Sequence, residues 1–430
     1  MKQRKFSAFC AGTLFLLWSM TAGALEPAFF PVINERLERA GIDYRGFIDL
    51  RGGRRLVEAA NEQSTSLAES RLQLEINGDL ESFLFKIKGE LFGDAVDDFV
   101  GGRLREAFFL VSPLPFADLK IGRQIMTWGT GDLLFINDLF PKDWEAFFIG
   151  RDDEYLKAPA DAVRLGIFLK TLNLDLIYMP RFNPSRYIDG DRLSYWSPRL
   201  GQIAGRAAKL VDDERQRWFN EDEIALRAYR NFSGLEAAVY FYDGYWKTPE
   251  GMKPDGRLYF PRLRVFGLSL RGNLGQGLAH CEAGYYDSRE DQSGADPLVR
   301  NREWRFLAGY EQELATDFTG GLQYYLEYMD DYENYRASLP RGAKARDEWR
   351  HLLTLRLTKL MLQQNLKFSL FIYYSPSDND AHLRPQISYK LNDDWLLIGG
   401  ANLFYGRTEH SFFGQFEENR NIYLGLRRNF

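Results

Sequence analysis

The sequence predicts an all-β fold, a transmembrane antiparallel up-and-down β-barrel of about eighteen strands, with sixteen as the alternative. Segments of about ten residues recur in which apolar and polar side chains alternate. Aromatic residues form 15% of the chain although its mean hydropathy is -0.38. No stretch after residue 30 approaches the roughly twenty apolar residues that a membrane-spanning helix needs. A closed barrel is the other structure that can cross a bilayer.

The N-terminus has the features of a secretory signal peptide. Lys2, Arg4 and Lys5 precede an apolar run from Phe6 to Met20, and small residues at Ala22-Gly23-Ala24 predict cleavage after Ala24. This peptide predicts export to the outer membrane of a Gram-negative cell. The predicted parts are a signal peptide, a periplasmic lead-in and an outer-membrane barrel, at residues 1–24, 25–41 and 42–430.

Alternation defines the strands, and it is clearest in 71–76 (RLQLEI), 163–169 (VRLGIFL), 322–328 (LQYYLEY) and 366–374 (LKFSLFIYY). One face of each segment suits lipid, and the other suits a wet interior. The predicted strands are 42–51, 67–77, 82–92, 103–112, 117–126, 161–170, 172–180, 223–231, 234–243, 262–272, 277–287, 302–313, 318–329, 349–360, 364–374, 381–391, 395–405 and 421–430.

The connections between these strands alternate between short and long. Turn formers such as Asn77-Gly78-Asp79 and Asn392-Asp393-Asp394 predict short periplasmic turns. An even number of strands places both ends of the barrel in the periplasm. The long polar loops, which we expect outside the cell, are 127–160, 181–222, 244–260, 287–301, 330–348 and 406–420.

The last strand ends on Phe430, with Leu426, Leu424 and Ile422 at alternate positions before it. This pattern resembles the terminal signature that the barrel-assembly machinery recognises, so that machinery is an expected partner through Phe430. Arg428 departs from the pattern, because a hydrophobic residue is usual at its position.

Residues 121–143 read IGRQIMTWGTGDLLFINDLFPKD. The motif consists of Gly122-Arg123-Gln124, Trp128-Gly129, Asn137-Asp138, Pro141 and Asp143. It resembles a large, mostly uncharacterised family of proteobacterial outer-membrane porin-like barrels, and its Gly-Arg-Gln strand end is similar to that of alginate-export-type porins. The resemblance implies transport across the outer membrane and no specific substrate.

The loop after the strand that carries Gly122-Arg123-Gln124 has about 34 residues, far more than a hairpin needs. Its aromatic rings must be buried somewhere, so we expect it to fold into the lumen as a constriction, with an external cap as the alternative. The constriction residues are predicted to be Trp128, Asp132, Asn137, Asp138, Asp143 and Arg151.

Arg123 conflicts with strict alternation, since it shares a face with Leu119 and Ile121. A charge facing hydrocarbon is costly. Two explanations remain open: a β-bulge reverses the alternation near Gly122, or Arg123 lies beyond the membrane at the rim.

Alternation also predicts which charges line the lumen. The basic set is Arg45, Arg71, Lys86, Lys88, Arg350, Arg356, Lys367, Arg384, Lys390 and Arg427. The acidic set, on the middle strands, is Glu236, Glu282, Glu303, Glu311 and Glu327. Opposed basic and acidic walls would create a field across a pore. In the alternative, these groups pair with one another and with the folded loop, and fill the barrel.

Three functions fit these features. The first is an outer-membrane channel for small polar or anionic solutes, with saccharides among the candidates. The second is a transporter of lipids or hydrophobic molecules with a lateral opening, and the third is a closed barrel with a binding or structural role. An enzyme is not expected: His351 is predicted to face lipid, as in a lipid hydrolase, but no outward serine adjoins it.

No cofactor or metal is expected, and the net charge of -5 gives no reason to expect nucleic acid. The expected partners are a small-molecule solute and the outer-membrane lipids, lipopolysaccharide included. A periplasmic partner is left open. A monomer is the preferred state, because no flat apolar wall for trimer formation is evident.

Overall fold

The computed structural model describes residues 37, 39–213, 215 and 217–430. The predicted signal peptide and nearly all of the predicted lead-in therefore lie outside the described residues. Residues 37 and 39 are helical, and the first strand begins at Ile42. Within the described part of the chain, no helix is long and apolar enough to cross a membrane.

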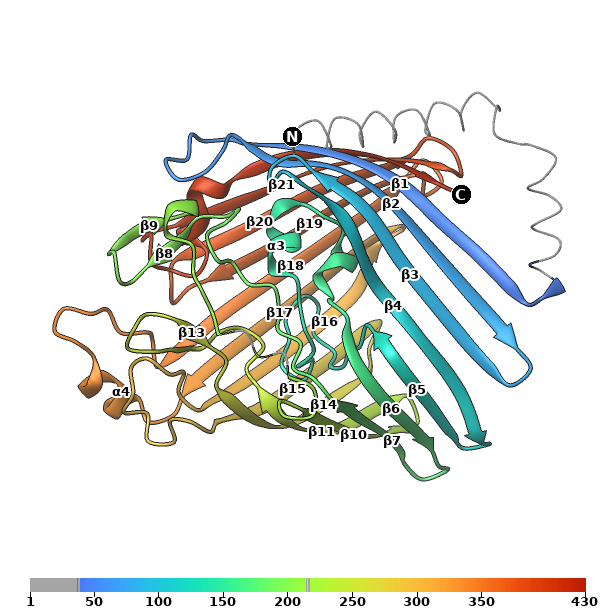
Figure 1. Cartoon of the computed structure of the whole chain (residues 1–430), viewed down its shortest axis with the longest axis horizontal. Helices are drawn as coiled ribbons and strands as arrows, with labels where there is room; N and C mark the ends of the chain where they lie inside the picture. The colour runs from blue at the N-terminus through green and yellow to red at the C-terminus, as the bar shows by residue number, and fades with distance from the viewer. Residues whose placement is uncertain (1–36, 38, 214, 216) are drawn as a thin grey trace.

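Eighteen antiparallel strands form one sheet, each pairing with its neighbours in chain order, and the first strand pairs with the last to close a barrel (Figure 1). The barrel strands are β1 (Ile42–Arg55), β2 (Thr65–Leu80), β3 (Phe83–Asp94), β4 (Phe99–Leu114), β5 (Ala117–Gln124), β6 (Ala160–Phe168), β7 (Asn173–Met179), β10 (Glu223–Phe232), β11 (Leu235–Tyr245), β14 (Arg262–Leu274), β15 (Gly277–Ser288), β16 (Glu303–Ala315), β17 (Phe318–Met329), β18 (Trp349–Met361), β19 (Leu366–Ser375), β20 (Asp380–Lys390), β21 (Trp395–Gly406) and β22 (Asn421–Asn429). The prediction of eighteen strands is confirmed, and the alternative of sixteen is wrong.

The remaining elements of the described residues lie in the long connections; most of these gather at one end of the barrel, and the connection that holds α3 lies among the strands (Figure 1). They are β8 (Tyr195–Ser197), β9 (Gln202–Ala204), β12 (Gly251–Met252), β13 (Leu258–Tyr259), the α-helices α3 (Trp144–Ile149) and α4 (Tyr332–Ser338), and the 3-10 helices η1 (Asp153–Leu156), η2 (Arg206–Ala208) and η3 (Gly414–Asn419).

The turn expected at Asn77-Gly78-Asp79 is wrong, because β2 continues through these residues and pairs Gly78 with Phe85 of β3. A Cβ atom on Gly78 would lie 2.0 Å from the Phe85 ring. The glycine therefore leaves room for a cross-strand aromatic ring, and the turn follows at residues 81–82.

The two faces of the sheet have opposite chemistry. On β2, Leu74 points outward and is 41% exposed, whereas its neighbour Glu75 points inward and is 4% exposed. Ring pairs gather on the outer face at the strand ends nearest the long loops, where Tyr328 and Trp349 have centroids 4.3 Å apart. An apolar outer face with aromatic rings at its border is the pattern of a barrel surrounded by lipid.

The end of β22 closes the barrel against β1. Phe430 and Gly46 exchange two backbone hydrogen bonds, of 2.8 and 3.0 Å. Arg428 pairs with Trp395 of β21, and its guanidinium lies over the indole ring at 5.7 Å. The arginine that interrupts the hydrophobic terminal pattern is thus accommodated on an aromatic ring.

Candidate functional site in the barrel lumen

The loop between β5 and β6, residues 125–159, lies inside the barrel, and we call it the inserted segment. Figure 1 shows α3, its helix, enclosed by the strands. Aromatic rings of α3 pack on the inner wall. The ring centroids of Phe148 and Phe404 of β21 are 5.5 Å apart, and those of Phe147 and Tyr373 of β19 are 6.3 Å apart. The prediction that this loop folds into the lumen is confirmed, and the external cap is wrong.

Local chemistry explains why α3 begins and ends where it does. Asp143 caps its N-terminus, accepting a 2.8 Å hydrogen bond from the Ala146 N–H. Gly150 ends it with a φ of 92°, a backbone conformation that favours glycine. A Cβ atom on Gly150 would lie 2.3 Å from the Tyr423 ring, so close packing on β22 also requires glycine.

Glu282 of β15 anchors the start of the inserted segment. Its carboxylate accepts hydrogen bonds from the Gly131 N–H at 2.8 Å and the Thr130 hydroxyl at 3.0 Å. It also accepts from the Asn137 amide side chain at 2.9 Å and the Asn137 N–H at 3.1 Å, and from the Thr130 N–H. One carboxylate of the wall therefore satisfies donors at two points of the segment.

A second set of bonds holds the segment to β18 and β19. Arg356 of β18 donates to both carboxylate oxygens of Asp132, one of the bonds measuring 2.9 Å. The Tyr373 hydroxyl of β19 donates to the Leu133 carbonyl at 3.0 Å. The bidentate arginine–carboxylate pair restricts both the position and the orientation of Asp132.

A third set of bonds holds the segment to the seam between the first and last strands. Arg51 of β1 donates to Asp152 at 2.6 Å and to the Gly150 carbonyl at 3.0 Å. Arg427 of β22 donates to the other oxygen of Asp152. Asp152 thus joins β1 to β22 from the inside, and the segment is bonded to the wall at β15, at β18 and β19, and at the seam between β1 and β22.

A buried ion network links the inserted segment to the external loop 180–222. Arg151 pairs with Glu69 of β2, and Arg192 of the external loop pairs with Asp94 of β3. Arg192 is 1% exposed and also lies 3.6 Å from Glu69. An external loop thereby reaches the same carboxylates that hold the inserted segment.

The predicted basic residues lie at inward register positions, and most of them form ion pairs. Examples of these pairs are Arg45–Glu75, Arg71–Glu90, Lys86–Glu106, Lys88–Glu154, Arg350–Glu327, Arg356–Asp132, Arg384–Asp153 and Arg427–Asp152. Lys367 and Lys390 lie nearer the short-turn ends of β19 and β20. Strands β1 to β3 also carry buried acidic residues beside the predicted basic ones, so this part of the wall is not purely basic. These acids are Asp49, Glu69, Glu75, Glu90 and Asp94.

The predicted acidic residues share the inward face of their strands. Glu236 pairs with Arg227 at 2.7 Å, and Glu303 and Glu327 bind arginines of the wall and of loop 289–302. Glu282 contacts the inserted segment, and Glu311 shares the inward face of β16 with Glu303. In these contacts, the charged residues of the wall pair with one another and with the inserted segment.

The remaining predicted residues of the inserted segment have contacts within it, and Trp128 also contacts the wall, with its ring centroid 5.8 Å from that of Tyr240 on β11. Trp128 contacts Phe140, with ring centroids 5.0 Å apart. Asp138 accepts from the Lys142 ammonium at 2.9 Å and the Thr127 hydroxyl at 2.8 Å. These contacts shape the segment itself, whereas Asp132, Asn137 and Arg151 hold it to the wall.

Arg123 lies at the rim of the barrel, which is the second of the two explanations left open by the sequence. Strands β4 and β5 pair without a shift from Ala107–Arg123 to Val111–Leu119, so no bulge reverses the alternation near Gly122. Arg123 points outward at the loop end of β5 and pairs with Asp161 of β6 at 3.1 Å. Its neighbour Gln124 is buried and donates to the Ala162 carbonyl at 3.1 Å.

Two histidines of the barrel, His280 and the hydrolase candidate His351, have polar partners. The His280 ring lies 3.2 Å from the Gln323 amide oxygen. The His351 ring nitrogen Nδ1 lies 2.6 Å from the Tyr324 hydroxyl. The Ser377 hydroxyl contacts His351 only through the backbone N–H, at 3.0 Å, so it is not oriented for a nucleophile–base pair.

Sequence reasoning missed several residues of the site. Asp49 and Arg51 share the inward face of β1 with Arg45, so alternation could have found them. Arg192 and Asp153 lie in loops, where no periodic pattern indicates direction. Their roles depend on contacts between segments far apart in the chain.

Loop 56–64 contains a titratable group where it contacts loop 180–222. The Glu62 side chain is 3% exposed and lies 3.9 Å from Arg55, and the neighbouring Asn61 donates to the Ile203 carbonyl at 3.3 Å. Burial raises the pKa of Glu62 to about 7, against the opposing effects of Arg55 and Arg206. Since this pKa is raised on folding, the protonated acid favours the docked loops.

We expect the docked arrangement to be most stable at pH values below the unfolded pKa of Glu62. It should lose stability as the pH rises through about 7. Hydrogen-exchange protection factors of residues 56–64 should therefore be higher at pH 5 than at pH 8. Glu62→Gln should remove most of this difference, and Glu58→Gln, at an exposed position of the same loop, should not. An undiminished difference in Glu62→Gln would assign the pH dependence to another group.

No protein-family profile and no curated protein matches the chain. Among solved structures, OccAB3 of Acinetobacter baumannii is similar, with 10% identity, a TM-score of 0.54, and coverage of 91% of this chain and 99% of that one. A triple mutant of the Rhodopseudomonas blastica porin has 12% identity and a TM-score of 0.40 over 90% of this chain and 100% of that one. The first likeness supports the fold. Neither comparison tests the resemblance of the Gly122–Gln124 motif to alginate-export-type porins.

Proposed function

We propose that the chain forms an outer-membrane channel for small polar solutes, preferentially anions, and that the inserted segment is its constriction. The supporting observation is a cavity of about 20 Å³ between the segment and the wall. Its lining is polar, with one carboxylate from the segment facing two wall arginines: Asp153, Arg356, Ser369, Phe371, Arg384, Gln386 and Tyr423. A volume of this size accommodates about one water molecule. The proposal takes this cavity as one hydrated position on the permeation route.

Charge at this level favours anions. Arg356 and Arg384 face the same cavity, while Asp153 pairs with Arg384 at 2.9 Å and remains partly exposed. Two guanidinium groups and one carboxylate line the cavity itself, because Asp132, the partner of Arg356, is not part of its lining. We propose that this local balance raises the concentration of anions. The proposal places the selectivity of the channel at these two arginines.

The setting of the channel follows from the same proposal. The apolar outer face would contact outer-membrane lipids and lipopolysaccharide, and the residues 1–24 would direct export and be removed. Phe430 would serve recognition by the barrel-assembly machinery. Because every barrel strand pairs with both neighbours, the lateral-opening alternative has no support in the pairing.

A closed barrel is the second candidate, and the observation that favours it is the bonding of the inserted segment to several parts of the wall: to β15 through Glu282, to β18 through Asp132, and to β1 and β22 through Asp152. The two candidates differ in one measurable property. A channel conducts ions in a planar bilayer, and a closed barrel is silent.

The test is single-channel recording of the refolded protein in potassium chloride gradients. We expect discrete open steps with chloride more permeant than potassium. Arg384→Gln should lower the chloride-to-potassium permeability ratio, because it removes one of the two cations at the cavity. Arg164→Gln, which alters an inward arginine paired with Asp175 outside this cavity, should leave the ratio unchanged. A folded but silent barrel would overturn the channel, and an unchanged ratio in Arg384→Gln would place the permeation route elsewhere.

A further inference from the structure

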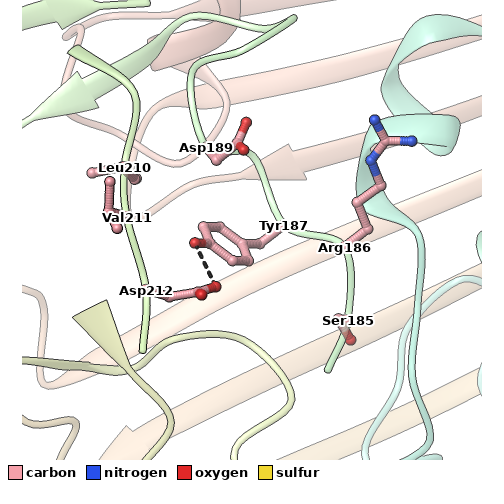
Figure 2. Close-up of a pocket in the computed structure, with 7 residues that line it drawn as sticks. All are labelled: Ser185, Arg186, Tyr187, Asp189, Leu210, Val211 and Asp212. Carbon is pink, nitrogen blue, oxygen red and sulfur yellow. Dashed lines mark hydrogen bonds between the residues drawn. The ribbon is translucent and has the colours of Figure 1, made fainter. Parts of the chain in front are cut away.

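The external loop 180–222 forms a cavity of about 310 Å³ that lies outside the constriction (Figure 2). Two stretches of the loop, residues 185–189 and 210–212, face each other across it. The Tyr187 ring lies between them, and its hydroxyl donates to Asp212 at 2.9 Å. The volume is at the lower end of the range for small-ligand sites, about 300–1,000 Å³.

The chemistry of this cavity is that of an aromatic surface beside hydrogen-bond acceptors. Arg186 points away from the cavity, toward the helix α3, where it pairs with Glu145 at 2.8 Å (Figure 2). The carboxylates of Asp189 and Asp212 and the aliphatic side chains of Leu210 and Val211 remain around the Tyr187 ring. Asp189 is balanced by Lys209 at 3.2 Å. The cavity therefore offers acceptors without a large excess of either charge.

These groups match a hydroxylated ring better than a simple ion. A carboxylate accepts two hydrogen bonds from adjacent hydroxyl groups. The face of a tyrosine ring packs against the apolar C–H face of a sugar ring and adds contact area at little entropic cost. An inorganic anion would meet two carboxylates, and an apolar solute would offer no donor to the lone pairs that Tyr187 and Lys209 leave free.

The floor of the cavity is continuous with the inserted segment. The Ser185 hydroxyl accepts from the Lys142 N–H at 2.9 Å, and the Arg186 N–H donates to the Lys142 carbonyl at 2.8 Å. The Trp144 N–H donates to the Arg186 carbonyl at 2.9 Å. Residues that line the cavity and residues that lead into α3 therefore form one hydrogen-bonded unit.

We propose that this cavity captures a sugar-like solute with adjacent hydroxyl groups at the extracellular entrance, and that its occupancy changes the conductance at the constriction. The first half of the inference is independent of the proposed channel. The second half rests on it, because only a conducting barrel can report occupancy as a current.

Isothermal titration calorimetry of the refolded full chain, with D-glucose and maltose as probes, tests the capture site. We expect at least one of the two sugars to bind. Tyr187→Ala should weaken binding about tenfold, the loss expected for about 1.4 kcal/mol of contact and hydrogen bonding. Asp212→Asn should weaken it in the same direction, because a neutral amide is a poorer acceptor.

Tyr332→Ala on α4 is the matched control, since it removes a tyrosine from another external loop. It should bind the sugar with wild-type affinity. Absence of binding for both sugars, or wild-type affinity in Tyr187→Ala, would overturn the capture site.

The second measurement adds the bound sugar to the extracellular side of a single open channel. We expect the current to change with a concentration dependence that matches the calorimetric affinity, and this dependence should shift in Tyr187→Ala. Sugar binding to a silent barrel would overturn the channel and leave the capture site standing. An open channel without sugar binding would overturn the capture site alone, and binding without a change in current would overturn the link to the constriction.

Discussion

Glu282→Ala is expected to raise the single-channel conductance severalfold, because it releases the start of the inserted segment from the wall. The buried carboxylate accepts from the N–H groups of Thr130, Gly131 and Asn137 and from two side chains. A hydrogen bond to a charged group contributes roughly 1.5–3 kcal/mol, and unpaired buried donors add a further cost. The free energy lost with several such bonds is larger than the contribution of the neighbouring Asp132–Arg356 pair, so that pair alone does not hold the start of the segment.

The conductance of Glu282→Ala should be compared with that of Glu236→Ala. Glu236 is another inward glutamate, but its partner is Arg227 of β10 rather than the inserted segment. The control should conduct like the wild type. Equal conductance in the two variants would show that the other wall contacts suffice to hold the segment.

Arg192→Met is expected to cause the largest loss of stability. The guanidinium is buried between Asp94 and Glu69, and its removal leaves these carboxylates partly uncompensated. Breaking a buried ion pair from one side costs about 3–5 kcal/mol. The free energy of unfolding, measured by denaturant titration in detergent micelles, should fall by that amount.

Arg206→Met provides the control on the same external loop, since Arg206 is 43% exposed and its pairs with Asp97 and Asp191 are 3.5 Å long. An exposed ion pair contributes about 0–1 kcal/mol, so this variant should unfold almost like the wild type. Adding Asp94→Asn to Arg192→Met should recover part of the lost stability, because it removes one uncompensated charge. Equal stability of Arg192→Met and the wild type would refute the assigned role of the network.

The strands were predictable because lipid and water impose opposite demands on alternate side chains of every strand. This demand makes Leu74 and Glu75 distinguishable in the sequence, and it holds for each strand of the closed sheet. The error at Gly78 has a local cause. A glycine in this strand makes space for the Phe85 ring, and the same residue type also marks turns.

The site was only partly predictable. Alternation indicates that Glu282 and Arg356 point inward, and the length and rings of the loop indicate that it is inserted. Alternation does not indicate which donors Glu282 receives or that Asp132 meets Arg356, because these contacts depend on the path of an irregular segment. The position of Arg123 needed the strand register, which the sequence leaves open.

The contacts of Asp152 have a consequence for the order of assembly. This carboxylate binds Arg51 of the first strand and Arg427 of the last, so its binding site is complete only after the two ends of the sheet have met. Folding must therefore bring together residues that are hundreds of positions apart before the inserted segment can reach its final place, and such long-range pairing is slow. The segment is then among the last parts to reach its final place, and until it does so the lumen lacks the contacts that the segment makes with the wall.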